Sequence, residues 1–224
     1  VLGQVDWVAA EDTRHSQTLL NHLGIKARLI SCHDHNEAER SPELVARLRD
    51  GESGALISDA GTPLVSDPGY RLVRACQDAG VAVVPVPGAS ALLAALAVSG
   101  QPSDRFLFEG FVPSKGAARE NALRRLAGLD VTSVIFEAPH RVVSLLESLA
   151  GLVDADRELT LCRELTKRFE TVRRGPVVEL LEWVRGDKDQ RRGELVLVLS
   201  PAARGEQLSE QDRALAKALL AELP

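Results

Sequence analysis

Short apolar runs alternate along the chain with longer segments whose apolar positions recur every three or four residues. Runs of the first kind predict β-strands, and the longer spacing predicts amphipathic helices. The predicted strands lie at residues 5–10, 27–32, 54–58, 82–86, 106–111, 132–137, 158–162, 170–173 and 194–199. Because strands and helices alternate regularly, we predict an α/β fold with a mostly parallel sheet.

Capping and breaking residues predict where several helices begin and end. Ser41-Pro42-Glu43 combines a capping side chain, a proline and a first-turn acid, so a helix is predicted to begin there. The glycines at 24 and 80 follow helical runs and predict two helix ends. Pro139 predicts the start of a further helix, whose apolar residues recur at helical spacing.

A short polar stretch at residues 99–104 predicts the boundary between two parts of the chain. We expect an N-terminal α/β domain at 1–103 and a C-terminal α/β domain at 104–200. Residues 201–224 are predicted to form a linker, at 201–205, and an amphipathic helix tail, at 209–223.

Composition excludes several classes of protein. The chain has 224 residues, of which 45% are hydrophobic and 26% charged, so it is neither disordered, collagen-like nor a coiled coil. It has no apolar run of membrane-spanning length and no recognisable signal peptide. The cysteines, at 32, 76 and 162, predict neither a disulfide framework nor a zinc site, and they favour a reducing compartment, the cytoplasm. The net charge of −5 is a mild argument against a bulk nucleic-acid binder.

Two loops follow predicted strands and carry the residues that a ligand site needs. Residues 58–70, SDAGTPLVSDPGY, contain more aspartate, proline and glycine than a turn requires. Residues 87–91, PGASA, hold the same place one unit later, although Ser90 there could simply cap a helix. Open α/β sheets bind ligands outside the carboxyl ends of their strands, so both loops are candidate ligand loops. Neither contains the GxGxxG pattern of dinucleotide sites.

Polar and charged motifs end four further strands. EDTR at 11–14 offers acids suited to general-base or hydroxyl-orienting work. HDHN at 33–36 could bind a metal, but the chain offers no clear further ligand, so we favour hydrogen-bonding groups that line a substrate cleft. Glu137 and Glu164 end later strands beside basic residues, where a structural ion pair is the alternative to a ligand contact.

Seven motifs occur in a specific order: EDTR, HDHN, SDAGTPLVSDPGY, PGASA, SDRFLFEGF at 103–111, FEAPHR at 136–141 and RELTK at 163–167. Over about residues 1–200 the chain closely resembles the 16S ribosomal RNA cytidine 2′-O-methyltransferases of the tetrapyrrole methylase superfamily. The resemblance implies two α/β domains, the first sheet mostly parallel and the second mixed, with S-adenosylmethionine in the cleft between them. It also implies a homodimer that acts on a cytidine in the decoding region of 16S ribosomal RNA, in the free RNA or in the small ribosomal subunit. The family opens with a strand and a PTPIGN-like loop that this sequence lacks, so an N-terminal strand is expected to be missing.

The resemblance also implies site residues. The implied cofactor-binding residues are Asp59, Ala60, Gly61, Thr62, Pro63, Gly88, Ala89, Ser90, Phe136, Glu137 and Ala138. For removal of the 2′-hydroxyl proton the candidates are Glu11, Asp12 and His33, with Arg14 placing a phosphate or a carboxylate; positioning without an essential base is the alternative. Five basic residues are candidate phosphate contacts, or else belong to solvated faces: Arg163, Lys167, Arg168, Arg173 and Arg174.

Three other functions remain open at the level of sequence. They are a small-molecule methyltransferase of the tetrapyrrole type, a non-catalytic RNA-binding module, and a metal-dependent hydrolase built on His33, Asp34 and His35. EDTR, HDHN and the basic stretch favour the RNA methyltransferase, for which we expect no metal. Because the 2′-hydroxyl distinguishes RNA from DNA, DNA is not an expected substrate, and no membrane partner is expected.

Overall fold

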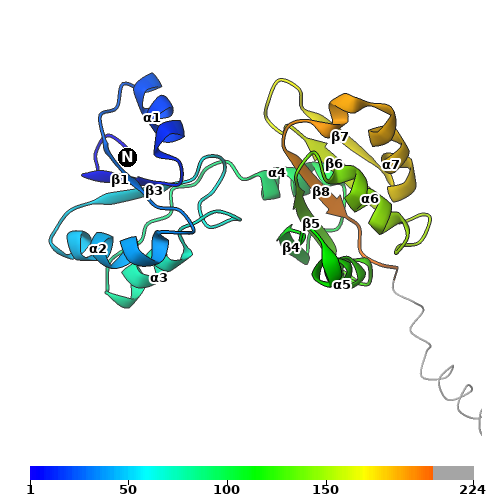
Figure 1. Cartoon of the computed structure of the whole chain (residues 1–224), viewed down its shortest axis with the longest axis horizontal. Coiled ribbons are helices and arrows are strands. Elements are labelled where there is room, and N and C mark those ends of the chain that lie inside the picture. The colour runs from blue at the N-terminus through cyan, green and yellow to red at the C-terminus, as the bar shows by residue number, and fades with distance from the viewer. Residues whose placement is uncertain (204–224) are drawn as a thin grey trace, which may run out of the picture. The chain divides into compact units, whose positions relative to one another are not determined.

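The computed structural model describes residues 1–203, so the predicted tail helix and the end of the predicted linker lie outside the described residues. The chain divides into two compact units, Val1–Ala94 and a second that begins at Ala95 (Figure 1). The domain boundary predicted from sequence was placed at residues 103 and 104. Within the described residues, no helix is long and apolar enough to cross a membrane.

The first unit is a three-stranded sheet with helices on both faces (Figure 1). Strand β1 is central in the order β2-β1-β3 and runs parallel to both neighbours, which confirms the parallel first sheet. Trp7 and Ala9 of β1 pack against the side covered by α2 and α3, while α1 covers the opposite face. In chain order the elements are β1 (Trp7–Ala10), α1 (Thr13–His22), β2 (Arg28–Ser31), α2 (Glu37–Arg49), β3 (Gly54–Ile57) and α3 (Tyr70–Asp78).

Helix α2 begins at Glu37, and the predicted start at Ser41 was wrong. The first turn forms upstream because the Glu37 N–H donates to the His33 carbonyl at 2.9 Å, and Asn36 Oδ1 accepts from the His33 N–H at 2.8 Å. Pro42 therefore lies inside the helix, and the buried Ser41 hydroxyl donates back to the Glu37 carbonyl at 2.7 Å. The predicted ends of α1 and α3, just before Gly24 and Gly80, are confirmed.

The predicted strand at residues 82–86 was also wrong, because the structure has no strand there. Val84 and Val86 are 78% and 67% exposed. The prolines at 85 and 87 have no N–H to donate to a ladder, so an apolar run alone does not produce a strand at this position.

The second unit contains a five-stranded sheet in the order β4-β5-β8-β6-β7 (Figure 1). Strands β4 and β5 are parallel, whereas the other neighbours are antiparallel, so the sheet is mixed, as the resemblance implied. Helix α4 (Ala91–Ser99) crosses the boundary between the units. The other elements are β4 (Phe106–Phe111), α5 (Gly116–Ala127), β5 (Thr132–Glu137), α6 (Val142–Ala150), β6 (Glu158–Arg163), β7 (Thr171–Pro176), α7 (Val177–Gly186), the 3-10 helix η1 (Lys188–Arg191) and β8 (Leu195–Leu199).

The core of the second unit lies between this sheet and helices α5, α6 and α7. Alternate residues of β8, such as Leu195 and Leu197, are buried in this core together with leucines of all three helices. Thr160 of β6 is also buried, and its hydroxyl donates to the Ser99 carbonyl of α4 at 2.9 Å. Because β4 and β5 are neighbouring parallel strands, their carboxyl ends lie on the same side of the sheet.

Candidate functional site

Carboxylates gather at the carboxyl ends of the three parallel strands in the first unit. Glu11 directly follows β1, Asp59 follows β3 closely, and Asp34 lies just past β2. Asp67 lies in the loop between β3 and α3, near enough that the negative charges of the other three raise its pKa. We call these four residues the acidic edge. Because β1 is parallel to both neighbours, the strands bring these side chains to the same end of the sheet.

Burial and mutual repulsion raise the pKa values of two carboxyls of the acidic edge. Burial raises the pKa of Glu11, and the negative charges of Asp59 and Asp34 raise it further. Burial raises the pKa of Asp67 to about 6, with Glu11 and Asp59 adding to the shift. A carboxyl whose pKa is closer to 7 is a better general base at neutral pH than an ordinary one.

Asp67 was not among the residues predicted from sequence. Its only sequence signal was its position within the loop at 58–70, which already had more polar and turn-forming residues than a turn needs. The property that distinguishes it from Asp59 is partial burial, which depends on the folded loop.

Asp12 caps the first helix of the unit. Its Oδ1 accepts the Arg14 N–H at 2.8 Å and the His15 N–H at 3.3 Å, and these hydrogen bonds lower its pKa. A carboxylate held in this way is a weaker base than Glu11. The Arg14 side chain is 95% exposed and borders a shallow hollow of about 550 Å³ between α1 and β2.

His33 lies next to the acidic edge and lowers the pKa of Glu11 through its charge. The residue is partly buried, and its Nδ1 is enclosed without a hydrogen-bond partner. Its ring packs edge-to-face on His35, with 5.9 Å between the centroids. Nowhere in residues 1–203 do three or more His, Cys, Asp or Glu side chains form a group that could hold a metal ion.

The two predicted cofactor loops of the first unit lie in contact with each other. The Thr62 hydroxyl donates to the Ala89 carbonyl at 2.9 Å, which joins loop 58–70 to loop 87–91. Gly61 has a φ of +76°, and a Cβ built on it would lie 4.0 Å from the same carbonyl oxygen. Most of the implied cofactor residues in these loops are exposed, and Pro63 and Ser90 are partly buried.

The backbone of loop 58–70 adopts an energetically unfavourable conformation at two residues. Leu64 and Ser66 have φ values of 72° and 66°, in the left-handed region that favours glycine. Each such residue costs on the order of 1–3 kcal/mol, and such residues cluster at functional sites. The buried Glu37 carboxylate supports the end of the loop, because it accepts the Gly69 and Leu72 N–H groups at 3.1 and 3.0 Å.

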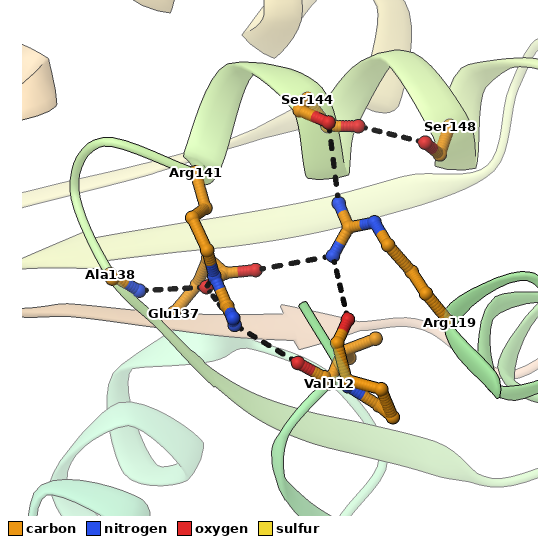
Figure 2. Close-up of polar contacts among 8 residues, drawn as sticks. Val112, Arg119, Glu137, Ala138, Arg141, Ser144 and Ser148 are labelled. Carbon is orange, nitrogen blue, oxygen red and sulfur yellow. Dashed lines mark hydrogen bonds and ion pairs between the residues drawn. The ribbon is translucent and has the colours of Figure 1, made fainter. Parts of the chain in front are cut away.

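At the end of β5 the side chain of Glu137 points into the protein and is fully buried (Figure 2). Its Oε1 accepts hydrogen bonds from the Ala138 N–H, at 2.8 Å, and from the Arg141 guanidinium. Its Oε2 has no hydrogen-bond partner and lies 3.9 Å from Nη1 of Arg119. We call these three side chains, Glu137, Arg141 and Arg119, the Glu137 network. Neighbouring Phe136 packs on Phe108, with 4.9 Å between the ring centroids.

The five predicted RNA-contacting residues lie in different environments. Arg163 ends β6 and is only 9% exposed, with Nη2 3.4 Å from the Thr171 hydroxyl. Lys167 pairs with Glu164 and Glu194, each at 3.1 Å. Both residues therefore have partners inside the second unit.

The other three lie on β7 or just before it. Arg174 pairs with Glu158 of the neighbouring strand at 2.8 Å. Arg168 lies 5.4 Å over the Phe169 ring, and Arg173 lies 4.6 Å over the Trp183 ring. Neither Arg168 nor Arg173 forms an ion pair within the described part of the chain. Arg163 forms no ion pair there either, but it is buried, so Arg168 and Arg173 are the two of the five that are both exposed and without an ion pair.

The chain is similar to known proteins over most of its length. Residues 1–181 match the family of Tetrapyrrole (Corrin/Porphyrin) Methylases. The chain is 47% identical to the ribosomal RNA small subunit methyltransferase I of Escherichia coli O157:H7, over 95% of this chain and 73% of the relative. It is 48% identical to the protein of the same name from Pseudomonas aeruginosa, over 100% of this chain and 80% of the relative.

Solved structures show the same fold at low identity. The uroporphyrin-III-C-methyltransferase from Thermus thermophilus matches all of this chain and 89% of its own, with a TM-score of 0.58 and 21% identity. The methyltransferase CobJ matches 88% of this chain and 95% of its own, with a TM-score of 0.57 and 18% identity. The family match and the close relatives together lead to one assignment: the chain belongs to the ribosomal RNA small subunit methyltransferase I family, within the tetrapyrrole methylases.

Proposed function

We propose that this protein transfers the methyl group of S-adenosylmethionine to the 2′-oxygen of one cytidine in the decoding region of 16S ribosomal RNA. The observation that carries the proposal is the 47% identity, over 95% of the chain, to a ribosomal RNA small subunit methyltransferase. The acidic edge supports it, because methylation of a hydroxyl requires a group that accepts the proton.

Glu11 is the proposed proton acceptor. When bound, S-adenosylmethionine supplies a methyl group on a sulfonium, which is already a good leaving group. The protein must therefore align the ribose hydroxyl, an effect worth up to about 7–11 kcal/mol in the best cases, and take up its proton. Glu11 suits this role because its pKa is raised, whereas Asp12 is engaged as a helix cap. Arg14 and His33 would place the nucleotide beside it.

Loops 58–70 and 87–91 would hold the cofactor largely through backbone groups. They fit such a ligand because Thr62 joins the two loops, and Gly61 leaves the backbone near Ala89 uncovered by a side chain. Residues 136–138 of the second unit would add a third contact. There the Ala138 N–H is already bound to Glu137, so this contact would come from the Phe136 ring and from carbonyl oxygens.

The RNA would be held by basic residues of the second unit, namely Arg163, Lys167, Arg168, Arg173 and Arg174. Arg168 and Arg173 have the strongest support, because both are exposed and neither forms an ion pair within residues 1–203. The cysteine pattern favours the cytoplasm as the compartment. We also propose that the protein acts there as a homodimer, for which the support is the family resemblance. Light scattering of the purified protein would test it, and a monomer at micromolar concentration would contradict it.

The direct test of the function is transfer of labelled methyl from S-adenosylmethionine to small ribosomal subunits that lack the modification. The labelled nucleotide is then mapped, and free 16S RNA and a DNA analogue are assayed in parallel. We expect label on a single ribose 2′-oxygen of one cytidine and none on DNA. Label on a base, on several riboses or on a tetrapyrrole precursor would contradict the proposal.

A further inference from the structure

We propose that the Glu137 network is a positioning device for the methyl-donor site, and that Glu137 acts through the backbone around it without touching the ligand. This inference rests on the proposed function, because the backbone in question belongs to the third proposed cofactor contact. Three features of the network support the inference: what it connects, how its charges are arranged, and what it leaves available to a ligand.

The network connects the ends of two neighbouring parallel strands (Figure 2). Arg141 donates to the Val112 carbonyl at 3.0 Å, and Arg119 donates to the Pro113 carbonyl at 3.3 Å. Both carbonyls lie just past β4, whereas Glu137 is the last residue of β5. One carboxylate therefore holds two guanidinium groups, and each of them reaches the loop after the adjacent strand. The spacing of the two loops depends on that carboxylate.

The charges of the network are buried or partly buried, and within residues 1–203 Glu137 is the only carboxylate that pairs with either arginine. The Glu137 side chain is 0% exposed, and the side chains of Arg119 and Arg141 are 10% and 21% exposed. Removing the only carboxylate would leave two poorly hydrated cations without a partner, which is the costly way to break a buried ion pair. A glutamine at 137 would keep the volume and an oxygen for the Ala138 N–H, but not the charge. Glu137→Gln therefore isolates the electrostatic part of the network.

The network also decides which groups of residues 136–138 a ligand can reach. The Ala138 N–H is bound to Glu137, and the Ala138 carbonyl accepts the Arg141 N–H at 2.9 Å, which closes the turn before α6. Phe136 packs between Phe108 and Phe111, with centroid distances of 4.9 and 5.8 Å. The ring and the backbone at this strand end are thus held together, and loosening the network would displace both from the proposed contact.

The experiment compares two network variants with a matched control. Glu137→Gln removes the charge, and Arg141→Lys keeps a charge but loses the guanidinium that reaches both Glu137 and Val112. The control is Glu109→Gln, because Glu109 lies on β4 and pairs with Arg125 of α5 outside the network. Each full-length variant is measured for S-adenosylmethionine affinity by calorimetry, for thermal stability, and for amide exchange at residues 112–115 and 137–141.

We expect both network variants to bind S-adenosylmethionine more weakly by roughly tenfold, which corresponds to about 1.4 kcal/mol of lost preorganisation. Amide exchange should rise in both loops, and KM for the ribosomal substrate should stay near the wild-type value. A purely structural role would lower the melting temperature but leave the affinity of the folded protein unchanged, and that result would overturn the inference.

The outcomes also separate this inference from the proposed function. If the wild-type protein does not bind S-adenosylmethionine at all, the proposed function fails and the inference fails with it. If the wild type binds and both folded network variants bind equally well, only the inference fails. Should Glu137→Gln not fold, Arg141→Lys decides the matter, because it retains the buried charge pair.

Discussion

Carboxylates end strands in both units of this protein, but they are compensated in opposite ways. In the first unit Glu11 and Asp67 face other carboxylates, and the pKa of each is raised. In the second unit Glu137 is buried beside two arginines. The Glu194 N–H, and after it the Lys167 side chain, donate hydrogen bonds to Glu164 and lower its pKa. Glu11 and Glu137, which both stand at the carboxyl end of a parallel strand, therefore differ in their electrostatic environment.

From this difference we infer that the carboxylates of the two units have different roles. A carboxyl whose pKa is raised by burial and like charges is suited to accepting a proton near neutral pH. A carboxylate neutralised by guanidinium groups cannot serve as a base, but it can fix the backbone around it. We therefore attribute proton transfer to the acidic edge and positioning to the Glu137 network.

The largest expected effect is on the rate after Glu11→Gln. Loss of a general base lowers the rate of methyl transfer by about 10²–10⁴-fold. A single-turnover assay with saturating S-adenosylmethionine would measure it, and Glu109→Gln, on a strand of the second unit, is the matched control. A rate within threefold of wild type would show that positioning is sufficient and that Glu11 is not the base.

The next effect is on stability after Glu137→Ala. Removing one partner of a buried ion pair costs on the order of 3 kcal/mol, and the two arginines here would both lose their counter-charge. Breaking the more exposed Glu109–Arg125 pair with Glu109→Ala should cost less than about 1 kcal/mol. Urea unfolding of both variants would test the contrast, and equal losses would contradict it.

A smaller effect concerns the pH dependence of stability. The pKa of Asp67 in the folded protein is about 6, above its ordinary value of 3.8, so the folded state binds the proton more tightly than the unfolded chain does. Its contribution to stability therefore falls as pH rises from about 4 to about 6 and remains unfavourable at neutral pH. Asp67→Asn should raise the melting temperature at pH 7.5 by roughly 2–4 °C.

The same variant should differ little from wild type at pH 4, where Asp67 is protonated in the folded protein. Melting curves at the two pH values are sufficient to measure this difference. A stabilisation that is equal at both values would mean that it does not come from the ionised Asp67 carboxylate, which burial and the nearby charges of Glu11 and Asp59 disfavour.

The smallest effect is on RNA binding after Arg173→Ala. Loss of one phosphate contact should weaken binding to the small subunit modestly and reduce the salt slope of the affinity by about 0.7–0.9. Arg185→Ala is the control, because Arg185 is exposed but paired with two glutamates. An unchanged salt slope for Arg173→Ala would remove this residue from the proposed RNA contacts.

Much of the fold could be predicted because buried strands correspond to short apolar runs in the sequence. Strand β4 has the predicted bounds, and β5 does as well. The apolar run at 82–86 was wrongly predicted to be a strand. The prolines at 85 and 87 lack the N–H groups that pairing with a neighbouring strand requires. The start of α2 was misplaced because Ser41 and Pro42 resemble a helix start, whereas contacts of Asn36 and His33 begin the helix earlier.

The sequence placed candidate residues at strand ends, but it could not predict the environment of each side chain. The motifs placed Glu11 and Asp12 at a strand end of the first unit and Glu137 at a strand end of the second, and within each sheet the neighbouring parallel strands do end on the same side. Whether a carboxylate caps a helix, as Asp12 does, or turns inward, as Glu137 does, depends on hydrogen bonds and burial that appear only in the folded chain. The raised pKa of Asp67 has the same origin.

The most direct test of these different roles measures two quantities on two variants. Glu11→Gln and Glu137→Gln are each assayed for single-turnover methyl transfer at saturating S-adenosylmethionine and for the affinity of that cofactor. We predict that Glu11→Gln loses rate and keeps affinity, whereas Glu137→Gln loses affinity and recovers much of its rate when the cofactor saturates. The opposite pattern, or equal losses in both variants, would contradict the account.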